Sequence, residues 1–203
     1  MSQGSSQNAA IIVVGSLHYD VMVEAPDRPR KGETVTGQRW YPNFCGIGGN
    51  QAVAAAQTGV ETRFVGAVGK DDFGDFMLDR LSQAGLPLER ITKCADCASG
   101  MSVASSDKEG DYGAVIVSGA NTQIDVGHFK DATLWQGAHV LVLQNEIPEA
   151  TNIAAAMAAR QSGVLVSLNA APWRKMSDEF LTLVDILVVN AIEAEEMGGA
   201  RLR

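Results

Sequence analysis

Short, uniformly apolar segments alternate along this chain with segments of helical periodicity, and this alternation limits the fold more than any other feature. The apolar segments predict strands that are buried on both faces, as in a parallel sheet: residues 11–14, 63–69, 138–143, 164–168 and 185–189. The other segments predict helices at residues 52–58, 72–84, 148–161, 177–183 and 190–197. Together they predict an α/β fold with a mostly parallel, doubly wound central sheet.

Two segments fall outside this alternation. Residues 24–41 are rich in Pro, Gly, Arg and Thr, and extended structure is indicated at residues 33–37; residues 99–117 form two extended segments around a polar turn at 107–111. We expect about 20–43 and 99–118 to form a small accessory sheet, inserted in one domain that spans residues 1–203. Val35, Met101 and Val103 are expected on one covered face of this sheet, which can serve as a lid or as a dimer-forming arm.

Charge and composition narrow the class of partner. The chain has 203 residues and a formal net charge of −8, so it has no basic field to attract nucleic acid or an anionic membrane surface. No apolar run has transmembrane length, and residues 1–10 lack the pattern of a secretory signal. We expect a cytoplasmic protein with a flexible N-terminal tail and a small-molecule partner.

The three cysteines fit a reducing compartment better than a disulfide framework. Cys94 and Cys97 form a C-x-x-C pair, but a structural zinc site needs a second pair or two suitably spaced histidines. A thioredoxin-like motif needs its own strand and helix. We therefore expect two free thiols in a loop. His139 lies within an apolar strand and is expected to be a core histidine.

A glycine-rich turn at residues 44–49 leads directly into a run of strong helix formers. Glycine allows a ligand to approach the backbone closely, and the first turn of the helix offers unpaired N–H groups and a positive dipole end. Asn50 is placed to cap the helix or to hold a ligand hydroxyl. A tight turn without a ligand is the alternative, and we favour the binding interpretation because so many glycines are costly in a simple turn.

Polar residues follow several of the predicted strands, where ligands of α/β sheets commonly bind: Asp20, Glu146, Asn169 and Asn190. Asp20 either accepts hydrogen bonds from sugar-like hydroxyls or caps local backbone. Asn190 and Glu193 stand at i and i+3, so they can orient magnesium-bound water or simply form a helix cap with an acidic first turn.

Two nucleotide-binding motifs are absent from the glycine-rich segments. A dinucleotide fingerprint beginning at Gly46 requires glycine at position 51, which is Gln51. A phosphate-binding loop ending at Lys70 requires Ser or Thr at Asp71 and glycine at Phe64. The sequence therefore argues against a dehydrogenase of the Rossmann type and against a P-loop enzyme.

Six short motifs in order resemble ribokinase and the related PfkB-type carbohydrate kinases, over residues 11–197. They are Val14-Gly15-Ser16-x-x-x-Asp20, Gly32-Glu33-Thr34-Val35, Gly46-x-Gly48-Gly49-Asn50-Gln51-Ala52, Gly119-Ala120-Asn121, Gln144-x-Glu146 and Asn190-x-x-Glu193. The resemblance implies a three-layer α/β sandwich with a small β lid. It also implies transfer of the γ-phosphate of ATP, as its Mg²⁺ complex, to a hydroxyl of a sugar or nucleoside.

The resemblance also implies the roles of particular residues. The implied substrate-binding residues are His18, Asp20, Gly46, Ile47, Gly48, Gly49, Asn50 and Glu146. Asn190 and Glu193 are implied to lie near the nucleotide phosphates, with Glu193 at the Mg²⁺ ion. A homodimer formed through the lid is expected.

Departures from the family pattern bear on substrate and activity. Ile47 replaces a usual Lys, His18 a usual Asn and Cys45 a common glycine, so the resemblance does not fix ribose as the sugar. The family's Gly-Ala-Gly-Asp motif, which carries the catalytic base and the anion hole, does not occur in these 203 residues. We therefore expect a C-terminally truncated kinase domain that holds no catalytic base and is inactive alone.

Three functions follow from these observations. The first is a sugar or nucleoside kinase of the ribokinase type. The second is a non-catalytic sugar-binding or oligomerisation protein derived from a kinase. The third, a nucleotide-dependent oxidoreductase, is disfavoured by the missing dinucleotide fingerprint.

Overall fold

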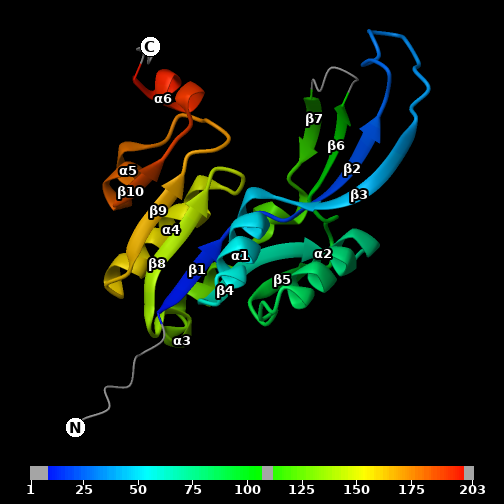
Figure 1. Ribbon diagram of the computed structural model, residues 1–203. Helices are drawn as coiled ribbons and strands as arrows, with labels where there is room; N and C mark the ends of the chain where they lie inside the picture. Colours follow the sequence, from blue (N-terminus) through cyan, green and yellow to red (C-terminus); the bar gives the residue numbers. More distant parts are fainter. Residues whose placement is uncertain (1–8, 107–111, 199–203) are drawn as a thin grey trace.

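The computed structural model describes residues 9–106 and 112–198 (Figure 1). The tail predicted at residues 1–10 lies outside the described part except for Ala9 and Ala10, and Ala10 begins the first strand. The polar turn predicted at 107–111 also lies outside it. Within the described residues, no helix is long and apolar enough to span a bilayer.

The central sheet has six strands in the described residues, in the order β10-β9-β8-β1-β4-β5, and every neighbouring pair is parallel. The strands are β1 (Ala10–Val14), β4 (Glu61–Gly69), β5 (Ile91–Cys94), β8 (Ala138–Gln144), β9 (Leu165–Asn169) and β10 (Ile186–Val188). The mostly parallel sheet is therefore confirmed. Strand β5 was not predicted from the sequence. Its four residues include a solvent-exposed lysine, Lys93, and give no strong apolar pattern.

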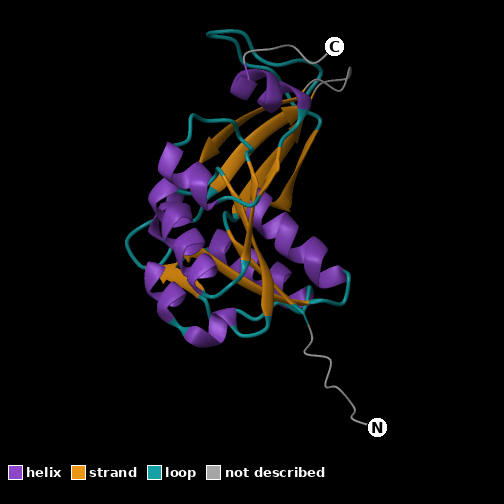
Figure 2. Ribbon diagram, turned by 90° about the vertical axis from the view of Figure 1, so that its left-hand side faces the viewer, coloured by secondary structure: helices purple, strands orange, loops and turns teal. Residues whose placement is uncertain are grey.

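Helices cover both faces of this sheet (Figures 1 and 2). They are α1 (Ile47–Gln57) and α2 (Asp72–Gln83), then the 3-10 helices η1 (Gly119–Gln123) and η2 (Val126–Lys130), α3 (Ala132–Trp135), α4 (Glu149–Gln161), α5 (Asp178–Leu183) and α6 (Ala191–Gly198). One core packs α1 and α2 on the sheet, and a second core packs α3, α4 and α5. This arrangement is the expected three-layer sandwich.

Strand β1 shows why a uniformly apolar strand requires two cores. Ile12 and Val14 belong to the core under α4, whereas Val13 belongs to the core under α1 and α2. Successive side chains of a strand point to opposite faces, so all three are fully buried. Each such burial contributes about 1.5–3 kcal/mol of hydrophobic stabilisation.

A second sheet stands apart from the first, with the order β3-β2-β6-β7 (Figure 1). Its strands are β2 (His18–Glu24), β3 (Arg39–Cys45), β6 (Met101–Ser106) and β7 (Tyr112–Val117). We call it the accessory sheet. The segments expected in such a sheet supply its strands, although residues 33–37 form no strand and belong to the connection between β2 and β3.

One face of the accessory sheet is apolar and largely open. Register places Val103 opposite Val21 and Val115, so these three side chains share that face. Val103 is 45% exposed and Val115 is 70% exposed, so the covered face predicted around Val103 is not covered within this chain. Val35 lies beside Val103 and Val115 at a cavity of about 440 Å³. At the base of the face, Tyr19 stacks on Phe73 of α2, with ring centroids 4.0 Å apart.

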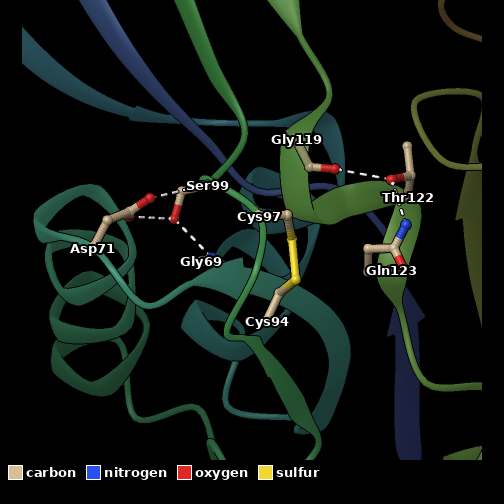
Figure 3. The surroundings of a disulfide bond; sticks show 8 residues. All are labelled: Gly69, Asp71, Cys94, Cys97, Ser99, Gly119, Thr122 and Gln123. Carbon is tan, nitrogen blue, oxygen red and sulfur yellow. Dashed lines mark hydrogen bonds between the residues drawn. A yellow bond between two sulfur atoms is a disulfide. The ribbon is translucent and has the colours of Figure 1, made fainter.

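Two sequence predictions about single residues are wrong. Cys94 and Cys97 form a disulfide at the end of β5 rather than two free thiols (Figure 3). The turn after β5 brings their Cα atoms to 5.7 Å, within the range that a disulfide spans. His139 is exposed rather than in the core, because β8 begins at the rim of the sheet, where its Nδ1 atom lies 3.0 Å from the carbonyl oxygen of Gly137.

Candidate functional site

The candidate site lies where strands β1 and β8 of the central sheet end, next to the accessory sheet. Strand β1 ends at Val14, and residues 15–17 lead directly into β2 of the accessory sheet. Strand β3 of that sheet ends at Cys45 and leads through Gly46 into α1. Strand β8 ends at Gln144, two residues before Glu146. The topology therefore brings the polar residues after β1, β3 and β8 together.

The glycine-rich turn packs the start of α1 directly against the backbone after β1. Gly46 is the N-cap and has a φ of 95°, a conformation that favours glycine. A Cβ atom on Gly48 would lie 2.6 Å from the backbone nitrogen of Ser16, so this close approach also requires glycine. Helix α1 starts at Ile47 rather than at residue 52. Asn50 lies exposed inside the helix, so of the two alternatives given for it, helix capping is excluded and contact with a ligand hydroxyl stays a prediction.

Glu146 is tied to this turn by two hydrogen bonds. Its Oε2 atom accepts one from the hydroxyl of Ser16 and one of 2.7 Å from the backbone N–H of Ile47. The carboxylate therefore lies at the amino end of α1, where the helix dipole stabilises negative charge. Two predicted site residues, Ile47 and Glu146, thus meet although 99 positions separate them in sequence.

His18 lies beside Glu146, with 3.9 Å between its Nδ1 atom and the Oε2 atom of Glu146. Its other ring nitrogen, Nε2, lies 3.2 Å from the Nδ2 atom of Asn121. Burial lowers the pKa of His18 below its usual 6.5, although the carboxylates of Glu146 and Asp20 act in the opposite direction. The ring is therefore neutral at physiological pH, since desolvation disfavours the imidazolium.

Asp20 lies two residues beyond His18 on the same face of β2. It is 3% exposed, and its Oδ1 atom has no hydrogen-bond partner among the described residues. Directly opposite on β6 lies Ser102, also 3% exposed, whose hydroxyl likewise has no such partner. Leaving a buried polar atom unpaired costs about 1–3 kcal/mol, so two adjacent cases indicate a polar ligand that completes them.

Cys45 closes this part of the site from β3. It pairs in register with His18 across the two strands, and its thiol is the free one of the described chain. Burial, with a smaller contribution from the neighbouring Asp20 carboxylate, raises its pKa to about 11. Cys45 therefore lines the site as an uncharged thiol and is not a nucleophile at neutral pH.

A cavity of about 350 Å³ opens beside His18 and Glu146, a size suited to a monosaccharide. It is lined by His18, Ile116, Ser118, Thr122, Asn145, Glu146, Ile147, Pro148, Pro172 and Arg174. Of the predicted substrate-binding residues, His18 and Glu146 line this cavity, and Ile47 donates a hydrogen bond to Glu146. Asp20 faces the same side from β2, whereas Asn50 is exposed on α1 and is not among the residues that line the cavity.

Asn190 and Glu193 form a reciprocal cap at the start of α6. The Oδ1 atom of Asn190 accepts from the N–H of Glu193, and the Oε2 atom of Glu193 accepts from the N–H of Asn190, both at 2.8 Å. The sequence left two interpretations of this pair open, orientation of magnesium-bound water or a helix cap. The geometry is that of a helix cap, a capping box. Among the described residues, no group of three or more His, Cys, Asp or Glu side chains is placed to hold a metal ion.

Several residues of the site were not assigned roles from sequence. Ser16 and Asn121 occur in the quoted motifs, and their motif positions were the available signal. Asn121 accepts from the backbone N–H of Leu17 and donates to its carbonyl oxygen, each at 2.8 Å. Ser102 had no sequence signal, because a serine in a strand of an accessory sheet is unremarkable until its neighbours are known.

Comparisons with known proteins agree with this fold. The model of the pfkB family of carbohydrate kinases matches residues 8–202. Ribokinase of Haemophilus influenzae is 34% identical over 194 residues, which cover 95% of this chain and 63% of that protein. Mouse ribokinase is 35% identical, with 94% of this chain and 60% of that protein covered. The chain belongs to the pfkB family of carbohydrate kinases.

Solved structures give the same result for the fold. The structure of Arabidopsis thaliana ribokinase complexed with ribose and ATP matches with a TM-score of 0.85 and 29% identity, over 94% of this chain and 62% of that one. A nucleoside kinase of Burkholderia thailandensis in complex with inosine matches with a TM-score of 0.76 at 21% identity, over 92% of this chain and 62% of that one. The chain thus spans about 60% of the length of these relatives.

Proposed function

We propose that this chain carries the sugar-binding part of an ATP-dependent kinase of the ribokinase type, which phosphorylates a hydroxyl of a sugar or nucleoside. The observation that carries the proposal is the position of Glu146, tied to the amino end of α1 and facing His18 at a monosaccharide-sized cavity. The membership of the pfkB family and the ribokinase relatives support it.

The proposed substrate contacts suit a polyol. A sugar hydroxyl both donates and accepts, so it needs acceptors and donors in fixed positions. Asp20 and Glu146 supply acceptors, and the proposed donors are His18 and the side-chain amide of Asn50, because the backbone N–H groups of residues 47–50 already donate within the chain. Such directional binding selects one hydroxyl for the phosphoryl group and holds it in place.

ATP is a proposed cofactor because relatives were solved with ATP or with ADP, and Mg²⁺ is proposed from the resemblance to the family alone. When bound, they supply the phosphoryl group and neutralise its charge. Asn190 and Glu193 are the residues proposed to lie near the nucleotide phosphates and the Mg²⁺ ion. A Mg²⁺ ion commonly takes only one or two protein carboxylates and fills its other positions with water and phosphate oxygens. The single carboxylate of Glu193, 6% exposed, is compatible with that donor set.

The accessory sheet is proposed to act as a lid on one face and as a dimer contact on the other. Asp20 and Ser102 lie on the face toward the site. Val103, Val115 and Trp40 leave the opposite face apolar and exposed. A second copy of the chain is the proposed occupant of that face. The net charge of −8 disfavours nucleic acid and anionic membranes as partners. The cytoplasm, which supplies ATP, is the proposed compartment.

Sugar binding and turnover test the proposal separately. Calorimetry of residues 1–203 with a panel of pentoses, hexoses and nucleosides should find a ligand, and binding of none would contradict the sugar site. A coupled ATP-consumption assay should show no kinase-like rate, because these residues lack the Gly-Ala-Gly-Asp motif. A missing base costs on the order of 10²- to 10⁴-fold, and a missing preorganised donor costs on the order of 10²- to 10³-fold. Turnover of about 1 per second would show that another residue acts as the base.

Sugar binding without turnover also fits the alternative, a non-catalytic sugar-binding or oligomerisation protein. The two functions differ in whether ATP binds productively. A fusion of the C-terminal third of a ribokinase to residue 203 restores a Gly-Ala-Gly-Asp segment. If the kinase proposal holds, this fusion should consume ATP only when sugar is present. A fusion that binds sugar and ATP yet consumes no ATP would favour the non-catalytic function.

A further inference from the structure

The orientation of the Asn121 side-chain amide is fixed by the backbone of Leu17. Asn121 is fully buried, and its two amide atoms bond to the two backbone polar groups of one residue. The N–H of Leu17 can only donate and its carbonyl can only accept, so the atom facing the N–H is Oδ1 and the atom facing the carbonyl is Nδ2. A flipped amide would place donor against donor and acceptor against acceptor.

This orientation determines the protonation of His18. The Nδ2 atom of Asn121 also lies 3.2 Å from the Nε2 atom of His18. Because Nδ2 carries only hydrogens to donate, Nε2 must be the acceptor and therefore carries no proton. A neutral imidazole has one N–H, which then resides on Nδ1. Asn121 thus presents the Nδ1–H group of His18 toward Glu146.

The Nδ1–H group lacks a protein partner at hydrogen-bonding distance on the Glu146 side. The separation of 3.9 Å between His18 Nδ1 and Glu146 Oε2 is too long for a hydrogen bond. The Oε2 atom of Glu146 already accepts from Ser16 and Ile47, which uses its two lone pairs. Its Oε1 atom carries the remaining acceptor capacity. A hydroxyl that accepts from His18 can at the same time donate to Glu146 Oε1.

We propose that Asn121 is a positioning residue that holds His18 in its Nδ1-protonated neutral form, so that His18 and Glu146 together recognise one hydroxyl of the substrate. The role of the hydroxyl rests on the proposed function, whereas the form of His18 does not. The site then selects an uncharged polyol that has a hydroxyl at this point. The corresponding deoxy sugar leaves the Nδ1–H group of His18 and the Oε1 atom of Glu146 without this partner.

The charged or titratable groups facing the ring come from three elements. Glu146 follows β8, Asp20 lies on β2, and Cys45 lies opposite on β3. The two carboxylates favour an imidazolium, and burial opposes it more strongly, which lowers the pKa of His18. The hydrogen bond that Asn121 donates also favours the neutral ring, because it requires a free lone pair on Nε2.

Nitrogen NMR of the ligand-free chain tests the form of His18 directly. The chain has three histidines, so a ¹⁵N–¹H correlation of the imidazole rings is readily assigned, and loss of one pattern in His18→Asn identifies His18. We expect a protonated, pyrrole-like Nδ1 and an unprotonated, pyridine-like Nε2 near neutral pH. A pyrrole-like Nε2, or two equivalent nitrogens, would overturn the proposal. His139→Asn, at an exposed position, is the matched control and should leave the His18 pattern unchanged.

A substitution of Asn121 tests whether this residue imposes the form. Asn121→Asp replaces the donor facing His18 with an oxygen, so the proton should move to Nε2 and affinity for the sugar that binds the parent chain should fall about tenfold or more. An unchanged tautomer in folded Asn121→Asp would overturn the positioning role. If this variant does not fold, His18→Asn and His18→Leu decide the donor role.

The His18 variants separate donation from simple packing. His18→Asn keeps an N–H donor and should bind the sugar within several-fold of the parent, whereas His18→Leu should lose about tenfold or more. Equal binding by His18→Leu and the parent would overturn the donor role. If the parent binds no pentose, hexose or nucleoside, the proposed function and the donor role both fail. The NMR result on the free chain would then still decide the form of His18 by itself.

Discussion

The hydroxyl of Ser16 donates a hydrogen bond to the carboxylate of Glu146, 130 positions away in sequence. This contact joins the segment that follows β1 to the segment that follows β8, the neighbouring strand of the central sheet. The same carboxylate oxygen accepts from the N–H of Ile47, so three separate segments converge on one atom. We therefore expect a replacement of this atom to affect both the proposed ligand binding and the position of α1.

Glu146→Ala should weaken binding of the sugar by about 1–3 kcal/mol, on the order of 5- to 150-fold. The reason is the loss of a charged acceptor at the amino end of α1. Titration calorimetry with the best ligand of the panel measures the effect. Glu89→Ala, at an exposed position near the opposite end of the sheet, is the control and should bind as the parent does. Equal affinities of all three proteins would contradict the role of Glu146.

Ser102→Ala should make the ligand-free chain more stable, by about 1 kcal/mol, and should weaken sugar binding. The substitution removes a buried hydroxyl that has no hydrogen-bond partner among the described residues. Urea unfolding with and without sugar measures both effects. Ser105→Ala on the same strand faces the other side and should change neither by much. A less stable Ser102→Ala chain with unchanged affinity would show that Ser102 contacts no ligand.

The free energy of unfolding should decrease as pH falls below about 6.5, and His18 should contribute to this decrease. Its pKa is lowered in the folded chain, so the unfolded chain binds more protons in the window between the folded pKa and 6.5. Stability therefore rises with pH through that window. Urea unfolding of the parent and of His18→Asn at several pH values measures the difference. The two slopes should differ below pH 6.5 and agree above it, and identical slopes would contradict a depressed pKa.

Alkylation should distinguish the free cysteine from the two cysteines of the disulfide. With the disulfide intact, only Cys45 is free, and its pKa of about 11 should make alkylation slow near neutral pH and faster as the pH approaches 11. Mass spectrometry counts the modified residues. After reduction with excess dithiol, Cys94 and Cys97 should be modified before Cys45. Rapid modification of Cys45 in the native chain near pH 7 would contradict its burial.

Val115→Glu should disrupt self-association if a second copy covers the apolar face of the accessory sheet. Val115 is 70% exposed there, and a charge in a dimer contact would be desolvated without a partner. Sedimentation velocity should give a dimer for the parent and a monomer for the variant. Val126→Glu, on η2 outside the accessory sheet, is the matched control and should stay dimeric. A monomeric parent at high concentration would rule out the proposed contact.

Most of the central sheet was predictable because its strands are uniformly apolar, although the expected burial on both faces fails at β10, an edge strand whose three residues are exposed. Helix α1 was placed too late along the chain, because Gly48 and Gly49 have poor helix propensity. Contacts with Ser16 and Glu146, distant in sequence, compensate for that propensity and start the helix at Ile47. The sequence could not show these contacts, since they exist only after β1 and β8 have paired.

The structure brings His18, Ile47 and Glu146 of the predicted site together, but the sequence could not predict their arrangement. The i and i+3 spacing of Asn190 and Glu193 is local, so the capping alternative could be stated from sequence. The proximity of His18 to Asn121 depends on how β7 returns the chain to the central sheet, and that path has no local signature. Ser102 became a candidate only through its register with Asp20.

The connections of the accessory sheet have a thermodynamic consequence. Strand β2 begins at His18, β3 leads into the N–H of Ile47, and β7 leads into Asn121. A tilt of this sheet therefore shifts three groups around the same ligand at once. If the partner copy favours one tilt, its association and sugar affinity become linked, each strengthening or weakening the other by the same factor. Sugar affinity measured against protein concentration would then report the quaternary state of the protein.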